Sequence, residues 1–289
     1  MKYAFMDNHR SEYALVKMCR WLGVSRSGYY KWRCRMPSQR TERRNKIKEI
    51  LAVLFGRYKA RDGAPRLTIE LNEMDVRCCR NHVAKLLSEL GLKARNGKRY
   101  KYFPAIQART HVSDNLLKRN FTASKPDEKW VSDITYIKVE RGYVYLAVVM
   151  DLYSRRIVGW SLDKTMTNTL IMDAFKMATA ARNAKPGLIV HSDRGVQYRS
   201  CEYHDLLYDQ GAQPSMSRKG NCWDNAAMES FFARLKVECI YAEDIKSKDD
   251  AYRSVFEYIE LFYNRIRKHS TNGYQSPENY EKQYYAAIA

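Results

Sequence analysis

Long hydrophobic runs are missing from this sequence. The longest uninterrupted apolar stretch is residues 143–150, and its eight residues are far fewer than the about 20 that a membrane-spanning helix needs. Charged side chains are scattered through the first 30 residues, so no apolar core of a secretory signal can form there. We therefore expect a protein without membrane segments that stays in the cytoplasm.

Glycine, proline and paired cysteines are also scarce. With 13 glycines and 7 prolines beside 45% hydrophobic and 29% charged residues, the composition is typical of a folded protein and excludes a disordered or fibrous chain. The seven cysteines form no CxxC pair, and Cys201 and His204 have no second pair to complete a zinc site. The sequence therefore predicts neither a disulfide framework nor structural zinc, but free and buried thiols.

Positive charge is abundant and concentrated at one end. The chain has 51 Lys and Arg against 32 Asp and Glu, a net charge of +19. Residues 1–120 hold 28 basic and 10 acidic side chains, whereas residues 121–289 hold 23 and 22. A basic region favours a polyanionic partner, because each neutralised phosphate releases a bound counterion. Nucleic acid is the leading candidate, and a merely solubilising surface is the alternative.

Residues 1–40 have the pattern of a helix-turn-helix unit. Gly23 provides a helix-ending position, Ser25 or Ser27 can cap the next helix, and that helix is expected at residues 29–35. Its basic and aromatic composition suits contact with DNA. The expected apolar stripe of the first helix comprises Tyr13, Leu15, Val16, Cys19 and Leu22. The candidate DNA contacts are Lys31, Arg33 and Arg35.

Residues 41–95 predict a second basic unit of the same kind. A helix at residues 41–58 precedes helices at 65–72 and 81–90, and Gly91 ends the last of them. An ordinary helical hairpin is the alternative for either unit, but two in tandem with this charge favour DNA binding. Residues 96–120 are interpreted as a basic linker, in which Lys98, Arg99 and Lys101 are further DNA-binding candidates.

Residues 121–289 predict an α/β domain. Extended segments at residues 130–139, 143–150 and 157–162 are separated by short turns, so they should be antiparallel neighbours. Helices then alternate with short apolar strands. We expect helices at residues 168–182, 200–210 and 225–239, and strands at 188–191 and 213–216. The result is a mixed sheet of three antiparallel and two parallel strands with helices on its faces.

Three acids of this domain are candidates for one site. Asp133 lies in mid-strand between apolar neighbours, Asp193 follows a buried strand, and Glu229 lies one turn into a helix with Lys236 on the same face. Three converging carboxylates suit two Mg²⁺ or Mn²⁺ ions about 4 Å apart, which serve in-line phosphoryl displacement. Capping or salt bridging is the alternative for any one acid alone. A serine-hydrolase triad at residues 191–193 is excluded, because consecutive strand residues face opposite ways.

Three sequence motifs resemble those of the integrase-type DDE transposases. They are WVSDITY at residues 130–136, HSDRGVQY at 191–198 and SRKGNCWDNAAMESFF at 217–232. The closest resemblance is to the second-reading-frame product of bacterial insertion sequences of the IS-three family. Thirty-five residues separate Asp193 from Glu229, the spacing that names the motif, and Lys236 occupies the basic position seven after the glutamate. The C-terminal region also resembles this family, at Arg267 and around residues 276–280.

The resemblance implies a ribonuclease-H-like catalytic core and a DNA-binding N-terminal region. Asp133, Asp193 and Glu229 would hold two Mg²⁺ ions, with Mn²⁺ as a substitute, and Lys236 would contact a phosphate. The partners it implies are double-stranded DNA, at terminal inverted repeats and at target sites, and an upstream reading frame product. A dimer or higher oligomer on DNA, associated with the nucleoid, is expected. A DNA-binding regulator and a structure-directed nuclease are the competing hypotheses.

Overall fold

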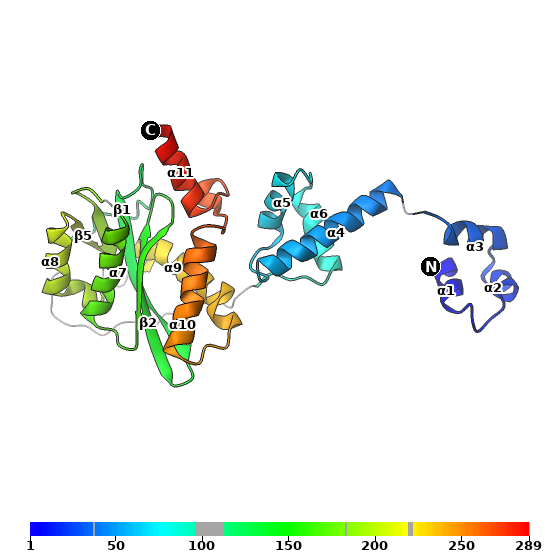
Figure 1. Cartoon of the computed structure of the whole chain (residues 1–289), viewed down its shortest axis with the longest axis horizontal. Coiled ribbons are helices and arrows are strands. Elements are labelled where there is room, and N and C mark those ends of the chain that lie inside the picture. The colour runs from blue at the N-terminus through cyan, green and yellow to red at the C-terminus, as the bar shows by residue number, and fades with distance from the viewer. Residues whose placement is uncertain (37, 96–111, 183, 219–221, 289) are drawn as a thin grey trace.

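The protein is described from a computed structural model that covers residues 1–36, 38–95, 112–182, 184–218 and 222–288 (Figure 1). Helices α1–α3 are set apart at the N-terminus, helices α4–α6 follow, and the mixed sheet with its covering helices forms the rest. Within these ranges, every helix is too short or too polar to serve as a membrane span.

The N-terminal helices are α1 (Lys2–Asn8), α2 (Leu15–Leu22) and α3 (Arg26–Arg33). Gly23 ends α2 at φ 62°, and the Ser25 hydroxyl accepts a hydrogen bond from the backbone N–H of Gly28, so both predicted signals are confirmed. The predicted apolar stripe is wrong in part. Tyr13 is exposed because α2 begins only at Leu15, and Val16 is exposed because this short helix buries one narrow face around Met18 and Cys19. The small core consists of Met6, Met18, Cys19 and Tyr29.

The next three helices are α4 (Gln39–Arg57), α5 (Ala64–Glu73) and α6 (Arg80–Glu89). Gly91 follows α6 at φ 67°, as its sequence position predicts. The core of these helices is continuous with the apolar core of the sheet. Its members from this part of the chain include Ile47, Leu51, Leu54, Leu67, Leu71, Val83 and Leu86. The second helical unit is therefore packed on the sheet domain and shares its hydrophobic stabilisation.

The sheet has five strands in the order β3-β2-β1-β4-β5. The strands are β1 (Lys129–Val139), β2 (Gly142–Asp151), β3 (Ile157–Asp163), β4 (Ile189–Ser192) and β5 (Gln213–Met216). Strands β1–β3 pair antiparallel, while β4 pairs parallel with both β1 and β5. The predicted α/β fold class, with its mixed sheet, is confirmed.

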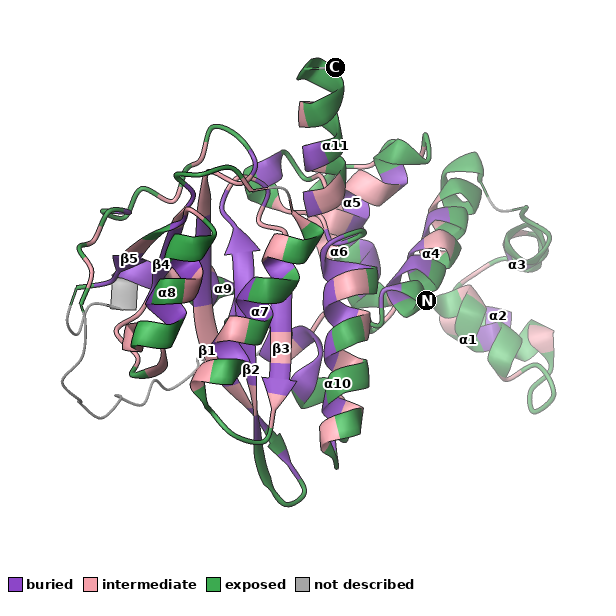
Figure 2. Cartoon of the chain, turned by 60° about the vertical axis from the view of Figure 1, so that its left-hand side comes forward, coloured by how far each residue is buried: buried purple, intermediate pink, exposed green. Residues whose placement is uncertain are grey.

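Helices cover both faces of this sheet, and its strands are largely buried (Figure 2). Helices α7 (Asn168–Ala181) and α8 (Cys201–Asp209) pack over one apolar cluster that includes Trp130 and Phe175. At Gly159 a Cβ would lie 2.2 Å from the carbonyl oxygen of Ala174, so α7 approaches β3 as closely as only glycine allows. Helices α9 (Ala226–Glu238) and α10 (Lys248–Phe256) cover the opposite face.

Several short helical segments complete the sheet domain. Single turns of 3₁₀ helix lie at η1 (Gln197–Arg199), η2 (Cys222–Asn225), η3 (Ile240–Ala242) and η5 (Ser270–Asn272). A π-helical segment, η4 (Glu257–Tyr263), continues α10. Of these, η3, η4 and η5 lie between α9 and the last helix, while η1 and η2 precede α8 and α9.

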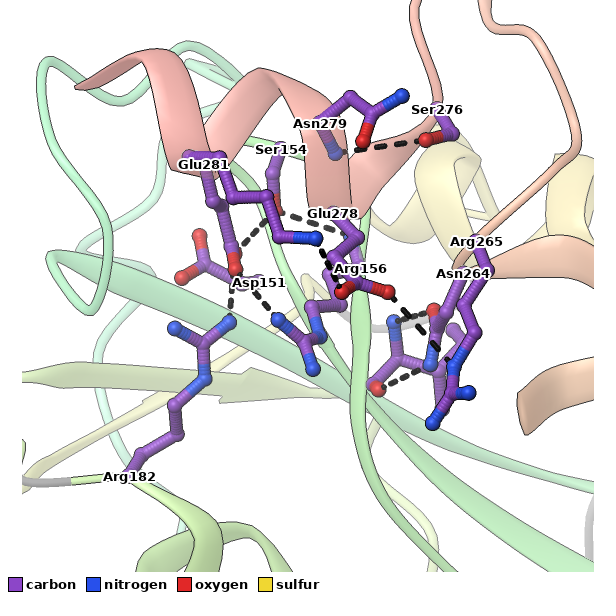
Figure 3. A network of polar contacts seen from close by, with 12 residues as sticks. Asp151, Ser154, Arg156, Arg182, Asn264, Arg265, Ser276, Glu278, Asn279 and Glu281 are labelled. Carbon is purple, nitrogen blue, oxygen red and sulfur yellow. Dashed lines mark hydrogen bonds and ion pairs between the residues drawn. The ribbon is translucent and has the colours of Figure 1, made fainter. Parts of the chain in front are cut away.

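That last helix, α11 (Pro277–Ile288), is fastened to the sheet through Glu281 (Figure 3). Its buried carboxylate accepts hydrogen bonds from Ser154 at 2.6 Å, Arg156 at 2.9 Å and Arg182 at 2.5 Å. The two arginines come from the start of β3 and from beyond the end of α7. The helix is therefore joined to two different elements by charge-assisted bonds.

The segment before β1 also packs on the sheet. Leu117 is buried, and the backbone N–H of Leu116 donates to the Ser215 hydroxyl at 2.9 Å. The carbonyl of Asp114 accepts from the N–H of Met216 at 3.2 Å. Residues 112–117 thus cover the outer edge of β5, although the sequence pattern there predicts only a linker. Lys98, Arg99 and Lys101, the candidate DNA contacts of that linker, lie outside the described residues.

The described cysteines are all free thiols, as predicted, but their expected burial is wrong for most of them. Among the six cysteines whose side chains the structure describes, Cys19 and Cys239 are buried. Cys34, Cys79 and Cys201 are exposed because they lie at helix ends, where side chains point away from the packed faces.

Candidate active site

Asp133 and Asp193 are brought together by the parallel pairing of β1 and β4. Val131 is opposite His191 in this ladder, Asp133 lies two residues further along β1, and Asp193 is the first residue beyond the end of β4. Because side chains alternate along a strand, Asp133 points to the same face as Val131, the one that α9 covers, and the charge of Asp193 acts on its pKa. Each is held by a local hydrogen bond of 2.8 Å, from the N–H of Ile134 and of Gly195 respectively.

Gly195 closes the turn that follows Asp193. A Cβ at this position would lie 2.9 Å from the Asp193 Oδ1 atom, within the range that real side chains avoid. The glycine therefore lets the backbone approach the carboxylate and donate to it.

Helix α9 supplies the other two candidate residues, Glu229 in its first turn and Lys236 in its last. Seven residues are nearly two helical turns, so the two side chains share a face. Glu229 is exposed, whereas Lys236 is only 4% exposed. The Lys236 ammonium lies 4.6 Å from the centre of the Tyr136 ring, three residues beyond Asp133 on β1. The sequence motif does not assign Tyr136 a role, but this cation–π contact places it in the site.

The electrostatics of the four residues are those of a crowded acidic site. Burial, then the neighbouring charges of Asp193 and Glu229, raise the pKa of Asp133 well above its usual value, while Lys236 acts to lower it. Burial also raises the pKa of Asp193 and of Glu229. Burial lowers the pKa of Lys236 to about 8, against the opposing effect of Asp133. Asp133 thus experiences both acids and the lysine, the group that the sequence predicts to converge.

Across the part of the chain that the structure describes, no three histidine, cysteine, aspartate or glutamate side chains gather closely enough to form a metal site. The three acids come from three places in the fold: Asp133 lies on β1, Asp193 follows β4 and Glu229 lies on α9.

Comparison with known proteins places the chain in a family. An integrase core domain family matches residues 123–222, a second one matches residues 210–277, and an HTH-like domain family matches residues 41–100. Transposase InsF for insertion sequence IS3A of Escherichia coli (strain K12) is 44% identical over 287 residues, covering 97% of this chain and 98% of that protein. This chain belongs to the IS3 family of insertion-sequence transposases.

Two further proteins are similar to this transposase. The transposase for insertion sequence element IS904 of Lactococcus lactis subsp. lactis (strain IL1403) is 41% identical over 86% of this chain and 98% of that protein. The solved catalytic core domain of HTLV-2 integrase, in complex with magnesium, is 15% identical over 55% of this chain and 98% of that one, with a TM-score of 0.44. With its integrase core and its transposase relatives, the enzyme is a DDE polynucleotidyl transferase.

The loop before α9 ties the transposase's Glu229 helix to its surroundings. Asp224 is fully buried and accepts hydrogen bonds from Arg218 and Arg119, which hold its pKa far below the usual range, Arg218 most strongly. Asn225 stands at the N-cap but makes no capping hydrogen bond. Its side-chain amide instead donates to the carbonyl of Ser132 at 3.4 Å. The helix therefore begins directly beside the strand residue that precedes Asp133.

His191 and Gln197, two other polar residues of the transposase motifs, are used in packing. His191 is fully buried between the hydroxyls of Ser215 and Ser217, at 2.8 and 3.1 Å, and burial lowers its pKa to about 4. Gln197 donates to the carbonyl of Met166. Both side chains thus make hydrogen bonds within the fold.

The N-terminal candidates for DNA contact lie on or near α3. Lys31 and Arg33 are exposed on this helix, and Arg35 is exposed beyond its end, because α3 starts at Arg26 and ends at Arg33, both earlier than predicted. Arg33 lies 3.5 Å from Asp7 of α1, which offsets part of its charge.

Proposed function

We propose that this transposase binds the terminal inverted repeats of its insertion sequence and catalyses metal-dependent cleavage at the element's 3′ ends, followed by strand transfer into target DNA. The observation that supports the proposal is the parallel pairing of β1 and β4, together with the effects of Asp193, Glu229 and Lys236 on the pKa of Asp133. Acids on strands next to an acid on a helix suit phosphoryl transfer, which mainly requires positioning and charge neutralisation.

Asp133, Asp193 and Glu229 would hold two Mg²⁺ ions, with Mn²⁺ as a substitute. Carboxylate oxygens are the donors that these ions prefer, and the repulsion that raises the pKa of Asp133 would be relieved by bound cations. When bound, such ions activate the attacking oxygen and stabilise the leaving oxygen of an in-line displacement. Lys236, held against Tyr136, would donate to a phosphate oxygen next to the cleaved bond.

Two displacements at phosphorus make up the proposed reaction. Water first forms a bond to the phosphorus at the element's end, and the 3′ oxygen of the element leaves as a free hydroxyl. That hydroxyl then attacks a target phosphodiester, so one P–O bond forms as another breaks. No covalent bond to the enzyme is required.

We further propose the chain's division into residues 1–40 and 41–95 for DNA binding, 96–120 as a connecting segment and 121–289 for catalysis. The HTH-like family match at residues 41–100 supports a DNA-binding role for the second unit. Fusion or association with an upstream reading frame product, and a dimer or higher oligomer on DNA, complete the proposal, since transposition needs two ends held together.

The test is an assay on labelled duplexes that carry the element's terminal repeat, with Mg²⁺ or Mn²⁺ against EDTA. We expect cleavage and joined products with metal and neither with EDTA. Cleavage without joined strands would favour a nuclease. Binding without chemistry would favour a regulator if the protein fused to its upstream partner is equally inactive.

The net positive charge of the N-terminal region predicts a steep salt dependence of DNA binding. We expect the affinity to fall by about 100-fold or more between 50 and 200 mM salt, because several phosphate contacts release counterions. Lys31→Ala should reduce the slope of log affinity against log salt by about one. Arg253→Ala is the control, since this exposed arginine of α10 pairs with Asp250 on the catalytic unit. Equal slopes for wild type and Lys31→Ala would remove Lys31 from the DNA contacts.

A further inference from the structure

The carboxyl end of α9 is capped by arginines of the preceding helical unit. We call residues 41–95 the HTH-like unit. The carbonyl oxygen of Glu238, the last residue of α9, accepts hydrogen bonds from Arg61 Nε at 3.1 Å and Arg95 Nη1 at 2.8 Å. Terminal helix carbonyls lack intrahelical partners and carry partial negative charge, so two guanidinium groups stabilise this end strongly.

The Glu238 side chain is bound by residues of the catalytic unit. Its carboxylate accepts two hydrogen bonds from Arg267, at 2.9 and 3.0 Å, and one from the Tyr258 hydroxyl at 2.8 Å. Arg66 of the HTH-like unit approaches the same carboxylate at 3.8 Å and donates to the carbonyl of Lys268 at 3.0 Å. Both units therefore meet at one buried residue of α9.

Arg61 has little freedom to move. Its side chain is 3% exposed, and its guanidinium lies 4.7 Å from the ring centre of Phe262 and 5.4 Å from that of Tyr258. We call the contact of Arg61, Arg66 and Arg95 with Glu238 the seat. Two further ion pairs join the same two units: Lys59 with Glu257 at 2.5 Å, and Lys268 with Glu73 at 2.6 Å. The apolar cores of the two units are also one cluster. The seat is thus a rigid contact at several points, unlike a flexible tether.

The same two units carry the parts that the proposed function needs. Helix α9 bears Glu229 and Lys236, and its carboxyl end forms the seat. On the HTH-like unit, α6 is fixed through buried Val83 and Leu86 and exposes Arg80 and Lys85. Because the seat joins the two units rigidly, it fixes the distance from α6, the helix that would face DNA, to the active site.

We propose that Arg61 and Arg95 are positioning residues that fix how far the cleaved phosphodiester lies from the base pairs held by the HTH-like unit. This inference rests on the proposed function, because it needs DNA bound by that unit and cut by the catalytic unit. With the seat intact, bound DNA is presented to the three acids in one register. With the seat loosened, neighbouring phosphodiesters reach the acids too.

The experiment maps the 3′ ends produced from a labelled terminal-repeat duplex at single-nucleotide resolution, using the full chain with Mn²⁺. For wild type we expect one dominant cut. For Arg95→Ala we expect cuts spread over adjacent phosphodiesters, about a tenfold loss of rate at the original position, and an affinity for the duplex within about twofold of wild type. Arg61→Ala with Arg95→Ala should spread the cuts further, and Arg95→Lys should restore much of the single register.

Arg57→Ala is the matched control. Arg57 is an exposed arginine of the same unit, and its guanidinium lies 5.9 Å from the ring centre of its neighbour Tyr58. This variant should keep the wild-type cut. Because Arg95 is only partly buried, its replacement should leave the fold intact, which thermal unfolding checks. A slower Arg95→Ala enzyme that still cuts at the single original position would overturn the inference and leave the proposed function standing. A wild type that neither binds nor cuts the duplex would overturn both.

Discussion

Glu229→Gln should abolish cleavage and strand joining, with a loss of roughly 10³-fold or more, while affinity for the terminal repeat stays close to that of wild type. The amide has nearly the shape of the carboxylate but no negative charge, so it cannot complete a cation site beside Asp133 and Asp193. Glu229 is exposed near the start of α9, and its replacement removes no buried contact. The measurement is single-turnover cleavage of a labelled duplex in Mg²⁺, with affinity measured in parallel in EDTA.

Glu140→Gln is the control for this result. Glu140 is exposed in the turn between β1 and β2, so the same change of charge on the same unit should leave cleavage unaltered. A Glu229→Gln enzyme that cleaves at the wild-type rate, or one that loses DNA binding in proportion to cleavage, would refute the role proposed for Glu229.

Arg267→Ala should lower the free energy of unfolding by about 3–5 kcal/mol, the cost typical of removing one partner from a buried ion pair. Arg267 and Glu238 are 5% and 2% exposed and are joined by two hydrogen bonds. Although burial raises the pKa of Glu238, its hydrogen bonds and the charge of Arg267 outweigh this and lower it overall. The pair therefore stabilises the fold fully at neutral pH and is lost only as the pH falls below the ordinary carboxyl range.

Urea unfolding of wild type and variant at pH 7 measures this effect. The double variant Arg267→Met with Glu238→Leu leaves no unpaired buried charge, so it should recover much of the lost stability. If Arg267→Ala unfolds at the same urea concentration as wild type, the pair contributes nothing and the network around Glu238 is incidental.

Local patterns in the sequence are enough to predict the five strands, helices α2–α9 and the fold class, but not α1, α10 and α11. Alternation marks β1, continuous apolar residues mark β2, and Gly23 and Gly91 mark helix ends that the structure confirms. The sequence also predicts that the acids converge, because one follows a short strand and another lies in the first turn of a helix at a known spacing; this stays a prediction.

The contacts between distant segments could not be predicted in this way. Nothing near Glu238 in the sequence indicates Arg61, 177 residues earlier, as a partner of its carbonyl. Tyr136 belongs to an alternating strand and is typical of packing, and only the folded chain brings Lys236 over its ring. The apolar stripe predicted around α2 was wrong in part for a related reason. Periodicity identifies an apolar face but not what covers it, and the small N-terminal core does not include Tyr13 or Val16.

Residues 112–117 cover β5, so the behaviour of an isolated catalytic fragment depends on the residue at which it starts. A fragment starting at residue 121 would leave the outer edge of β5 bare and remove Arg119 from buried Asp224. Bare strand edges recruit other strands, so such a fragment is prone to aggregation even with its active site complete. One starting at residue 112 keeps this edge covered and keeps Arg119 beside Asp224.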